Sequence, residues 1–301
     1  MTEDNILLEP GSLWNKLVEQ TQYARQCGAL HSIETEYQFI EHNGISFLVR
    51  SLSNLARKEK AKKKQKQTNQ DFNPFLPYEP DLFVTDISST HLCLLNKFNV
   101  VDNHLLIVTR DFEEQENRLN LADFLALWLC MQEIDGLAFY NGGKIAGASQ
   151  RHKHLQLIPL PFIAEECYLP IEPVIATAEV NDSIGKIPQF PFHHAIALLR
   201  VTQSDSPIDI AQGMLACYDS LLQAVSLDLD SNSLVQPGAY NMLVTREWML
   251  IVPRSQESFS SIAINSLGFA GSLFVRDREQ IKLLEELTPM NILSKVAFPE
   301  K

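Results

Sequence analysis

The sequence predicts a mixed α+β protein built on a largely antiparallel β-sheet. Short runs rich in Val, Ile, Leu, Phe and Tyr are separated by turn residues, which is typical of strands joined by hairpins. Asn43-Gly44 lies between two such runs, and this dipeptide is a strong hairpin signal. A few longer segments carry apolar residues at helical spacing instead. These observations favour paired strands with helices covering the sheet.

The predicted elements follow one another along the whole chain. An amphipathic helix is expected at 12–27, where apolar and small residues fall on one face. The hairpin occupies 36–50. The strand that contains His154 should end at Pro159, because proline cannot donate to a sheet ladder. Further strands are expected at 82–84, 91–97, 105–109, 137–140, 194–201, 240–244, 248–252 and 272–275, and further helices at 119–131, 208–224 and 276–287.

The composition is that of an ordinary globular protein. The chain has 301 residues, 45% of them hydrophobic, and a net charge of −12. This charge argues against a general nucleic-acid binder, which needs a broad positive surface. No apolar run approaches the roughly 20 residues of a membrane helix, and the first residues lack the basic start of a signal peptide. Because the five cysteines are scattered singly and no export signal is evident, we expect a cytoplasmic protein. The acidic charge and the short apolar runs predict that it has no nucleic-acid and no membrane partner.

One short segment opposes the acidic character of the rest. Residues 57–66 hold seven basic side chains and one acidic one, a net charge of +6. Blocks of like charge are usually solvated linkers, so 57–72 is predicted as a flexible basic loop. Lys58 lies near the start of this block, close to the preceding strand.

The segment Gly-Ala-Ser-Gln-Arg-His-Lys-His-Leu-Gln at 147–156 carries the strongest functional signal. If it runs into a strand, His152, His154 and Gln156 share one face while Lys153 points away. The small residues at 147–149 would let a ligand approach their backbone N–H groups, which can form an anion-binding concavity. Two metal-ligating or two core histidines are the alternatives. No Cys-x-x-Cys pair completes a metal site, and neither alternative explains the small residues or the glutamine.

This segment resembles the His-x-His-x-His motif of the histidine-triad superfamily, in the variant with Gln third. That variant is shared by the galactose-1-phosphate uridylyltransferases and the diadenosine tetraphosphate phosphorylases, also called ATP adenylyltransferases. The uridylyltransferases typically carry Pro where this chain has Lys153. Five further segments, in order between about 35 and 288, resemble the phosphorylases: Asn-Pro-Phe-Leu-Pro-Tyr at 73–78, Leu-Asn-Lys-Phe-Asn-Val at 95–100, His-Leu-Leu-Ile-Val-Thr-Arg at 104–110, Glu-Trp-Met-Leu-Ile-Val-Pro-Arg at 247–254, and Ile-Asn-Ser-Leu-Gly-Phe-Ala-Gly at 264–271.

The resemblance implies a histidine-triad-like fold in which two half-repeats share one largely antiparallel sheet flanked by helices. Residues 1–301 would form a single domain, with a catalytic half at about 35–165 and a degenerate half at about 190–290. A weak sequence similarity between 105–110 and 249–254 is consistent with such a repeat, although two apolar strands can also be similar by chance. The resemblance further implies a monomer with one active site.

The activity that the resemblance implies is phosphorolysis of diadenosine tetraphosphate to ATP and ADP. His154 would be the nucleophile, forming an adenylyl-histidine, with His152 ordering its hydrogen bonds. A divalent cation, Mg²⁺, would bind with the polyphosphate. Nucleotide or phosphate contacts are implied for Lys58, Asn96, Lys97, Asn141, Gly147, Ala148, Ser149, Gln150, Gln156, Asn265, Ser266, Leu267, Ser272 and Arg276.

Some of these assignments have structural alternatives, and the activity has rivals. Leu267 and Ser272 could serve packing alone, and Arg276 could be a surface residue at a helix start. Lys97 lies in an apolar strand, where burial is costly without an anionic partner. A histidine-triad hydrolase, a transferase that uses ADP and sulfate, and a nucleotide-binding module are the alternative functions. Gln156 opposes the first, because an amide cannot give a proton to a leaving group.

Overall fold

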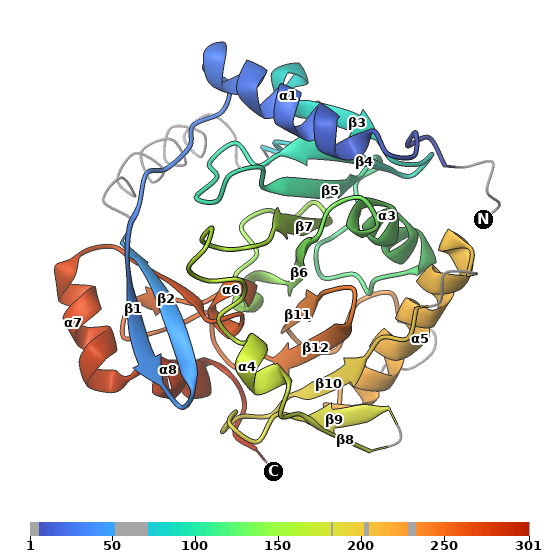
Figure 1. Ribbon diagram of the computed structural model, residues 1–301. Helices are drawn as coiled ribbons and strands as arrows, with labels where there is room; N and C mark the ends of the chain where they lie inside the picture. Colours follow the sequence, from blue (N-terminus) through green and yellow to red (C-terminus); the bar gives the residue numbers. More distant parts are fainter. Residues whose placement is uncertain (1–5, 52–71, 182, 202–204, 228–232, 301) are drawn as a thin grey trace.

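The computed structural model describes residues 6–51, 72–181, 183–201, 205–227 and 233–300. Its centre is a ten-stranded sheet in which every neighbouring pair is antiparallel (Figure 1). In spatial order the strands are β3 (Phe83–Asp86), β4 (His91–Leu95), β5 (Leu105–Thr109), β7 (His154–Pro159), β6 (Gly136–Gly142), β11 (Tyr240–Val244), β12 (Trp248–Pro253), β10 (Ala195–Leu198), β9 (Ile184–Lys186) and β8 (Glu179–Asn181). The predicted α+β class with a largely antiparallel sheet is confirmed.

The sheet consists of two halves with the same topology. In the first half a hairpin, β4–β5, is followed by helix α3 (Leu121–Met131) and a second hairpin, β6–β7. In the second half β9–β10 is followed by α5 (Pro207–Ala224) and β11–β12. The inner strands β6 and β11 pair at the centre, so the strand order is symmetric about that pair. Two fused half-repeats therefore form one sheet, as expected, whereas the residue bounds given to the halves stay predictions.

The sequence similarity between 105–110 and 249–254 does not mark equivalent strands. By topology β5 corresponds to β10, and β12 corresponds to β7. Strands β7 and β12 are both six residues long, and they begin at His154 and Trp248. The alignment suggested by this similarity was wrong, because buried central strands are continuous apolar runs and therefore resemble one another. The histidine strand of the first half thus has a fully apolar counterpart.

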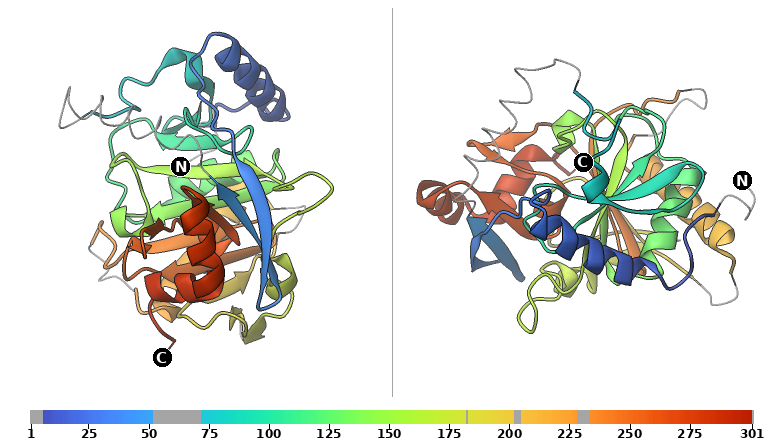
Figure 2. Two further views of the ribbon diagram at one scale, coloured as in Figure 1. Left: turned by 90° about the vertical axis from the view of Figure 1, so that its left-hand side faces the viewer. Right: turned by 90° about the horizontal axis from the view of Figure 1, so that it is seen from above.

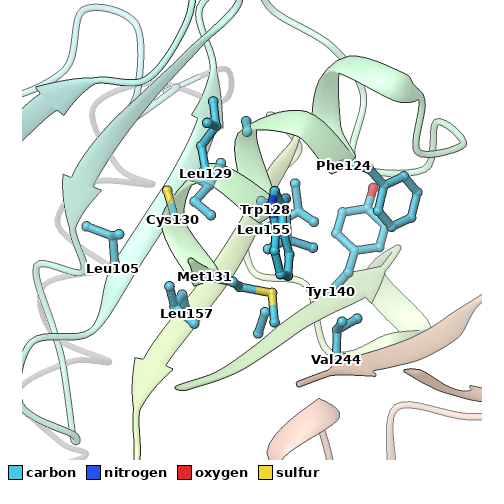
Figure 3. Close-up of a cluster of buried hydrophobic side chains, with 14 of the residues drawn as sticks. Leu105, Phe124, Trp128, Leu129, Cys130, Met131, Tyr140, Leu155, Leu157 and Val244 are labelled. Carbon is cyan, nitrogen blue, oxygen red and sulfur yellow. The ribbon is translucent and has the colours of Figure 1, made fainter. Parts of the chain in front are cut away.

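Helices α3 and α5 pack against each other on one face of the sheet (Figure 1). Each begins at a capping box: the Asn120 side chain accepts from the N–H of Asp123, and that of Ser206 accepts from the N–H of Asp209. Leu155 and Leu157 of β7 point toward α3 within this core (Figure 3). Because side chains alternate along a strand, His154 and Gln156 point to the opposite face.

The opposite face is partly covered by a second layer (Figures 1 and 2). Its three-stranded sheet holds the predicted hairpin, β1 (Glu36–His42) and β2 (Ile45–Ser51), with β15 (Ser272–Val275) parallel to β2. Asn43 and Gly44 form the turn with φ of +52° and +77°. Helices α6 (Ser266–Phe269), α7 (Arg278–Leu287) and α8 (Pro289–Val296) complete the layer, while α1 (Leu13–Gln26) packs on β3 at the sheet edge.

The pattern missed α6, α8 and the shortest elements, which are α4 (Glu172–Ile175), β8, β9, β13 (Ser258–Phe259) and β14 (Ile262–Ala263). Most of these have only two to four residues, too few to show a periodicity. The basic loop predicted at 57–72 falls outside the described residues, except for Phe72. No helix in the described ranges is long and apolar enough to cross a membrane.

Lys153, between the two histidines of the motif, is fully buried on the helix side. Its Nζ lies 2.6 Å from Oδ2 of Asp123 and 3.0 Å from Oε2 of Glu113. Asp123 also accepts from Nε2 of His91. Burial by itself raises the pKa of Asp123, but the bond from His91 and the charge of Lys153 bring that pKa below its ordinary value. This ion cluster anchors the start of β7 to α3.

Asp123→Asn should therefore lower the free energy of unfolding by about 3–5 kcal/mol, because it leaves the Lys153 ammonium buried without its nearest counter-charge. Urea unfolding followed by circular dichroism measures this difference. Glu300→Gln is the matched control, because it breaks an ion pair with Lys186 whose side chains are about half exposed, and should cost less than about 1 kcal/mol. Equal losses in the two variants would show that the cluster does not stabilise the fold.

Candidate active site

A cavity of about 480 Å³ opens on the face of the sheet to which His154 and Gln156 point. The first half contributes the segments around β4, β5, β6 and β7, and the second half contributes residues between Glu257 and Gln280. Eleven of the residues implied by the resemblance line it: Asn96, Lys97, Asn141, Gly147, Ser149, Gln150, His154, Gln156, Asn265, Leu267 and Arg276. Both halves of the chain therefore build one site.

The imidazole of His154 is neutral, and its Nε2 is directed into the cavity. Its side chain is 5% exposed, and its Nδ1 donates to the carbonyl oxygen of His152 at 2.8 Å. This bond fixes the tautomer, so Nε2 carries the lone pair. Nε2 has no hydrogen-bond partner among the described residues, and the ring lies edge-on to Phe75 at the cavity wall. Burial lowers the pKa of His154 to about 4, so the ring is uncharged at neutral pH.

Gln115 holds the backbone of His154 from the neighbouring loop. Its Oε1 accepts from the N–H of His154 at 2.9 Å, and its Nε2 donates to the His154 carbonyl oxygen at 3.2 Å. The Gln115 side chain is 2% exposed. Sequence reasoning missed this residue, because nothing in its local pattern marks a partner 39 positions away.

His152 does not share the cavity face with His154, contrary to the sequence-based expectation. The alternation argument assumed that the strand extends to 152, whereas β7 begins at His154. The His152 ring turns instead toward Asn73, with Nδ1 3.0 Å from its Nδ2, and Nε2 lies 2.8 Å from the carbonyl oxygen of Thr109. His152 thus contacts His154 through its backbone carbonyl, while the ordering role expected of the His152 side chain stays a prediction.

Gln156 is oriented by a chain of hydrogen bonds that begins in the backbone. The N–H of Phe98 donates to Oδ1 of Asn96, so Nδ2 of Asn96 faces Nδ1 of His104 at 3.2 Å. His104 then carries its proton on Nε2 and donates to Oε1 of Gln156 at 2.9 Å. The amide NH₂ of Gln156 is therefore the end left for the cavity. His104 was missed in the sequence, although it precedes β5 by one residue and faces the same side as Leu106.

The glycine-rich turn before the motif differs from the expected phosphate cradle. The N–H of Gly147 donates to the carbonyl oxygen of Lys144, and that of Ala148 donates to the carbonyl oxygen of Gly143. These two donors are consumed inside the turn, so the expectation that they face a ligand is wrong for this conformation. The N–H groups of Ser149 and Gln150 have no partner within the described ranges and are the ones left for an anion.

Gly147 has a steric role instead. Its φ is +94°, and a Cβ there would lie 2.8 Å from Cβ of Asn265 and 3.0 Å from the carbonyl oxygen of Ile264. The turn of the first half thus packs directly on the segment that precedes α6 in the second half. Any larger residue at 147 must push these two segments apart.

The described residues that line the cavity carry equal numbers of positive and negative side chains. Among the described lining residues the cations are Lys97 and Arg276, and the anions are Glu79 and Glu257. Lys97 follows the end of β4 rather than lying within it, and its Nζ is 2.5 Å from Oε2 of Glu79. The anionic partner expected for Lys97 is therefore a carboxylate of the chain itself. Lys58 lies outside the described residues.

Three implied contact residues do not reach the cavity lining: Ala148, Ser266 and Ser272. Ser266 is fully buried. Its N–H donates to Oδ1 of Asn141, and its hydroxyl lies 2.8 Å from the same oxygen and 3.0 Å from the carbonyl oxygen of Tyr140. Ser272 is buried in β15, opposite Leu48 of β2. In this conformation Ser266 and Ser272 support the site rather than line it. No group of three or more potential metal ligands occurs in the part of the chain that the structure describes.

Two family models match the chain. The model described as the Ap4A phosphorylase N-terminal domain matches residues 3–177, and the model described as the ATP adenylyltransferase C-terminal domain matches residues 188–299. The outer hairpin β8–β9 lies between the two matches.

Curated relatives and solved structures agree with these models. Diadenosine 5',5'''-P1,P4-tetraphosphate phosphorylase 2 of Saccharomyces cerevisiae is 30% identical over 259 residues, which cover 77% of each chain. The same yeast's protein APA1 is 30% identical over 233 residues, 68% of each chain. The crystal structure of yeast Ap4A phosphorylase Apa2 in complex with Ap4A has a TM-score of 0.79 at 25% identity, covering 96% of this chain and 98% of that one. The chain belongs to the Ap4A phosphorylase (ATP adenylyltransferase) family.

Proposed function

We propose that this protein catalyses the phosphorolysis of diadenosine tetraphosphate to ATP and ADP through an adenylyl group on His154. The observation that carries this proposal is a buried neutral imidazole, held by a hydrogen bond at Nδ1, whose Nε2 faces a cavity. The described lining of that cavity includes several amides and two cations. Nucleophilic attack on phosphorus needs an uncharged nitrogen that also leaves readily, and imidazole meets both needs. The yeast relative named as the phosphorylase is similar over most of the chain.

The reaction consists of two displacements at one phosphorus atom. In the first, Nε2 of His154 bonds to an α-phosphorus, and the bond from that phosphorus to the bridging oxygen breaks, so ATP leaves with the oxygen. In the second, an oxygen of inorganic phosphate bonds to the same phosphorus, and the bond to Nε2 breaks. ADP is released and the neutral imidazole is restored. Placement and charge stabilisation supply the catalysis.

Gln156 is compatible with ATP as the leaving group of the first displacement. An amide can donate a hydrogen bond to a phosphate oxygen but cannot deliver a proton. ATP leaves as a polyphosphate anion and needs no proton, so the missing acid costs little in the first displacement. The orientation imposed by His104 presents the donor end of the amide.

A divalent cation is proposed to enter with the polyphosphate. Among the described lining residues the two cations are offset by Glu79 and Glu257, so these residues offer little net positive charge to a tetra-anion. Mg²⁺ prefers phosphate oxygens and water to dedicated protein ligands. We further propose that the enzyme works as a monomer, because the two halves of a single chain complete the cavity. Free cysteines support a cytoplasmic location for it.

The product pattern tests the proposed function. With diadenosine tetraphosphate, Mg²⁺ and phosphate, ATP and ADP should form in equal amounts; without phosphate, ATP release should stop after about one equivalent. Continuous ATP and AMP formation without phosphate would identify a hydrolase and contradict the proposal. Faster turnover with sulfate, giving an adenosine phosphosulfate, would make sulfate the main acceptor.

The first displacement should tolerate acid. Because burial keeps the pKa of His154 at about 4, the nucleophile stays neutral as the pH falls from 8 to about 5, and its rate constant should decline only as the pH approaches 4. Single-turnover release of ATP without phosphate measures this step free of the acceptor's own titration. Circular dichroism at each pH checks that the protein stays folded. A half-maximal rate near pH 6.5 would mean that His154 titrates as an ordinary imidazole.

Lys97→Ala should raise KM for diadenosine tetraphosphate about tenfold or more, since it removes one of the two cations among the described lining residues and leaves Glu79 to repel the substrate. Lys186→Ala serves as the control, because Lys186 lies in β9 at the far edge of the sheet and its side chain is 52% exposed. That variant should change KM by less than about twofold. Equal effects in the two variants would show that Lys97 contributes only general charge.

A further inference from the structure

Two asparagines meet at the joint between the halves. Asn141 of β6 and Asn241 of β11 are register partners in the central antiparallel pair, and they are 3% and 0% exposed. Only Asn141 lines the cavity. Since both side chains are amides with a donor end and an acceptor end, their orientation decides which atoms the cavity sees.

The orientation of each amide is set by neighbours that can act in only one sense. The backbone N–H of Ser266 lies 2.9 Å from Asn141, so the atom that faces it must be Oδ1. The Nη1 of Arg254 lies 2.6 Å from Asn241, so the atom there must also be Oδ1. The other end of Asn241, Nδ2, then donates to the carbonyl oxygen of Ala146 at 2.8 Å and to Oδ1 of Asn141 at 2.9 Å.

These contacts form a chain of hydrogen bonds in which Arg254 donates to Asn241 and Asn241 donates to Asn141. Oδ1 of Asn141 accepts from Asn241 and from the N–H of Ser266. Its Nδ2 has no acceptor among the described residues, so the free end of this buried amide is a donor facing the cavity. Because Asn141 lines the cavity, this NH₂ is available to an acceptor oxygen of a ligand.

Arg254, the first donor of this hydrogen-bond chain, is a buried cation. Its side chain is 2% exposed, and within the described ranges it forms no ion pair with a carboxylate. Backbone carbonyls of Val296, Ile264 and Gln256 accept from it, and its guanidinium lies over the ring of Phe269. Although burial lowers the pKa of Arg254 to about 9, it remains charged at neutral pH. A cation can only donate, so it fixes the polarity of everything that follows.

We propose that Arg254 and Asn241 are positioning residues of the second half that hold the Asn141 amide with its NH₂ toward the cavity, where it donates to an anionic oxygen of the reacting phosphate. This inference rests on the proposed function, since it requires a phosphate in the cavity. It assigns the half without histidines a part in the reaction beyond its share of the fold.

Asn241→Asp replaces the donor in the middle of this hydrogen-bond chain by an acceptor. The aspartate still accepts from Arg254, in a buried ion pair that preserves the fold, but it cannot donate to Asn141. Oδ1 of Asn141 then faces a carboxylate oxygen that repels it, which opposes the orientation set by the N–H of Ser266. The rate constant for adenylyl transfer in a single turnover should fall at least tenfold, while the melting temperature stays within a few degrees of that of the wild type.

A double-mutant cycle separates positioning from general packing. In an Asn141→Ala background, Asn241→Asp should lower the transfer rate by no more than about twofold, because the amide that it acts on is gone. The same tenfold loss in both backgrounds would overturn the proposal. Should Asn241→Asp fail to fold, Asn241→Ser, whose hydroxyl both donates and accepts, should transfer at least fivefold faster than Asn241→Ala. Equal rates in this second pair would overturn it as well.

The wild-type protein in the same assay keeps the two levels of inference apart. If the wild type releases no ATP from diadenosine tetraphosphate, the proposed function itself fails. If the wild type releases ATP and Asn241→Asp matches it, the function stands and the positioning role of Asn241 and Arg254 fails.

Discussion

The antiparallel pairing of β6 with β11 is the constraint on which the rest of the molecule depends. It joins two halves of equal topology into one sheet and leaves no edge between them. The same pairing sets Asn141 opposite Asn241 and lets the turn at Gly147 pack on the segment before α6. Residues that approach the cavity from the second half, such as Asn265 and Arg276, reach it only because this joint is made.

The chemistry of the site follows from burial combined with directed hydrogen bonds. Burial keeps His154 neutral, and the carbonyl of its neighbour two positions back aims it. Gln156 and Asn141 are amides whose donor ends are selected by chains that begin at obligate donors, the N–H of Phe98 in one case and Arg254 in the other. The site is therefore prearranged to donate to an anion while supplying no proton. Such an arrangement suits transfer between good leaving groups.

The sequence predicted the architecture well because its signals are local. Strands β5, β11 and β15 begin and end at the predicted residues, since each is a short apolar run bounded by polar or turn residues. The motif placed His154 and Gln156 on one face, and the resemblance led to the correct family. Resemblance also named Asn141, although nothing local shows that its amide has a fixed direction.

The sequence could not supply the partners that give these residues their orientation. Gln115 and His104 bond to the motif from 39 and 52 positions away, and only the pairing of strands brings them close. The misplacement of His152 has a local cause, because periodicity cannot tell where a strand begins. In the turn at 143–148, two N–H groups that the composition left available for a ligand donate instead to carbonyl oxygens of the turn. Contacts across the sheet, and the exact hydrogen bonds of a turn, lie beyond what patterning can show.

The central claim is that the adenylyl group passes through His154, and the covalent intermediate tests it most directly. The protein is mixed with diadenosine tetraphosphate and Mg²⁺ without phosphate, quenched in alkali, digested and analysed by mass spectrometry. The account predicts one AMP group, bound to His154, stable to alkali, removed by acid and absent from His154→Ala. A stable AMP adduct on His152 or another residue, or a full equivalent of released ATP with no adduct, would contradict it.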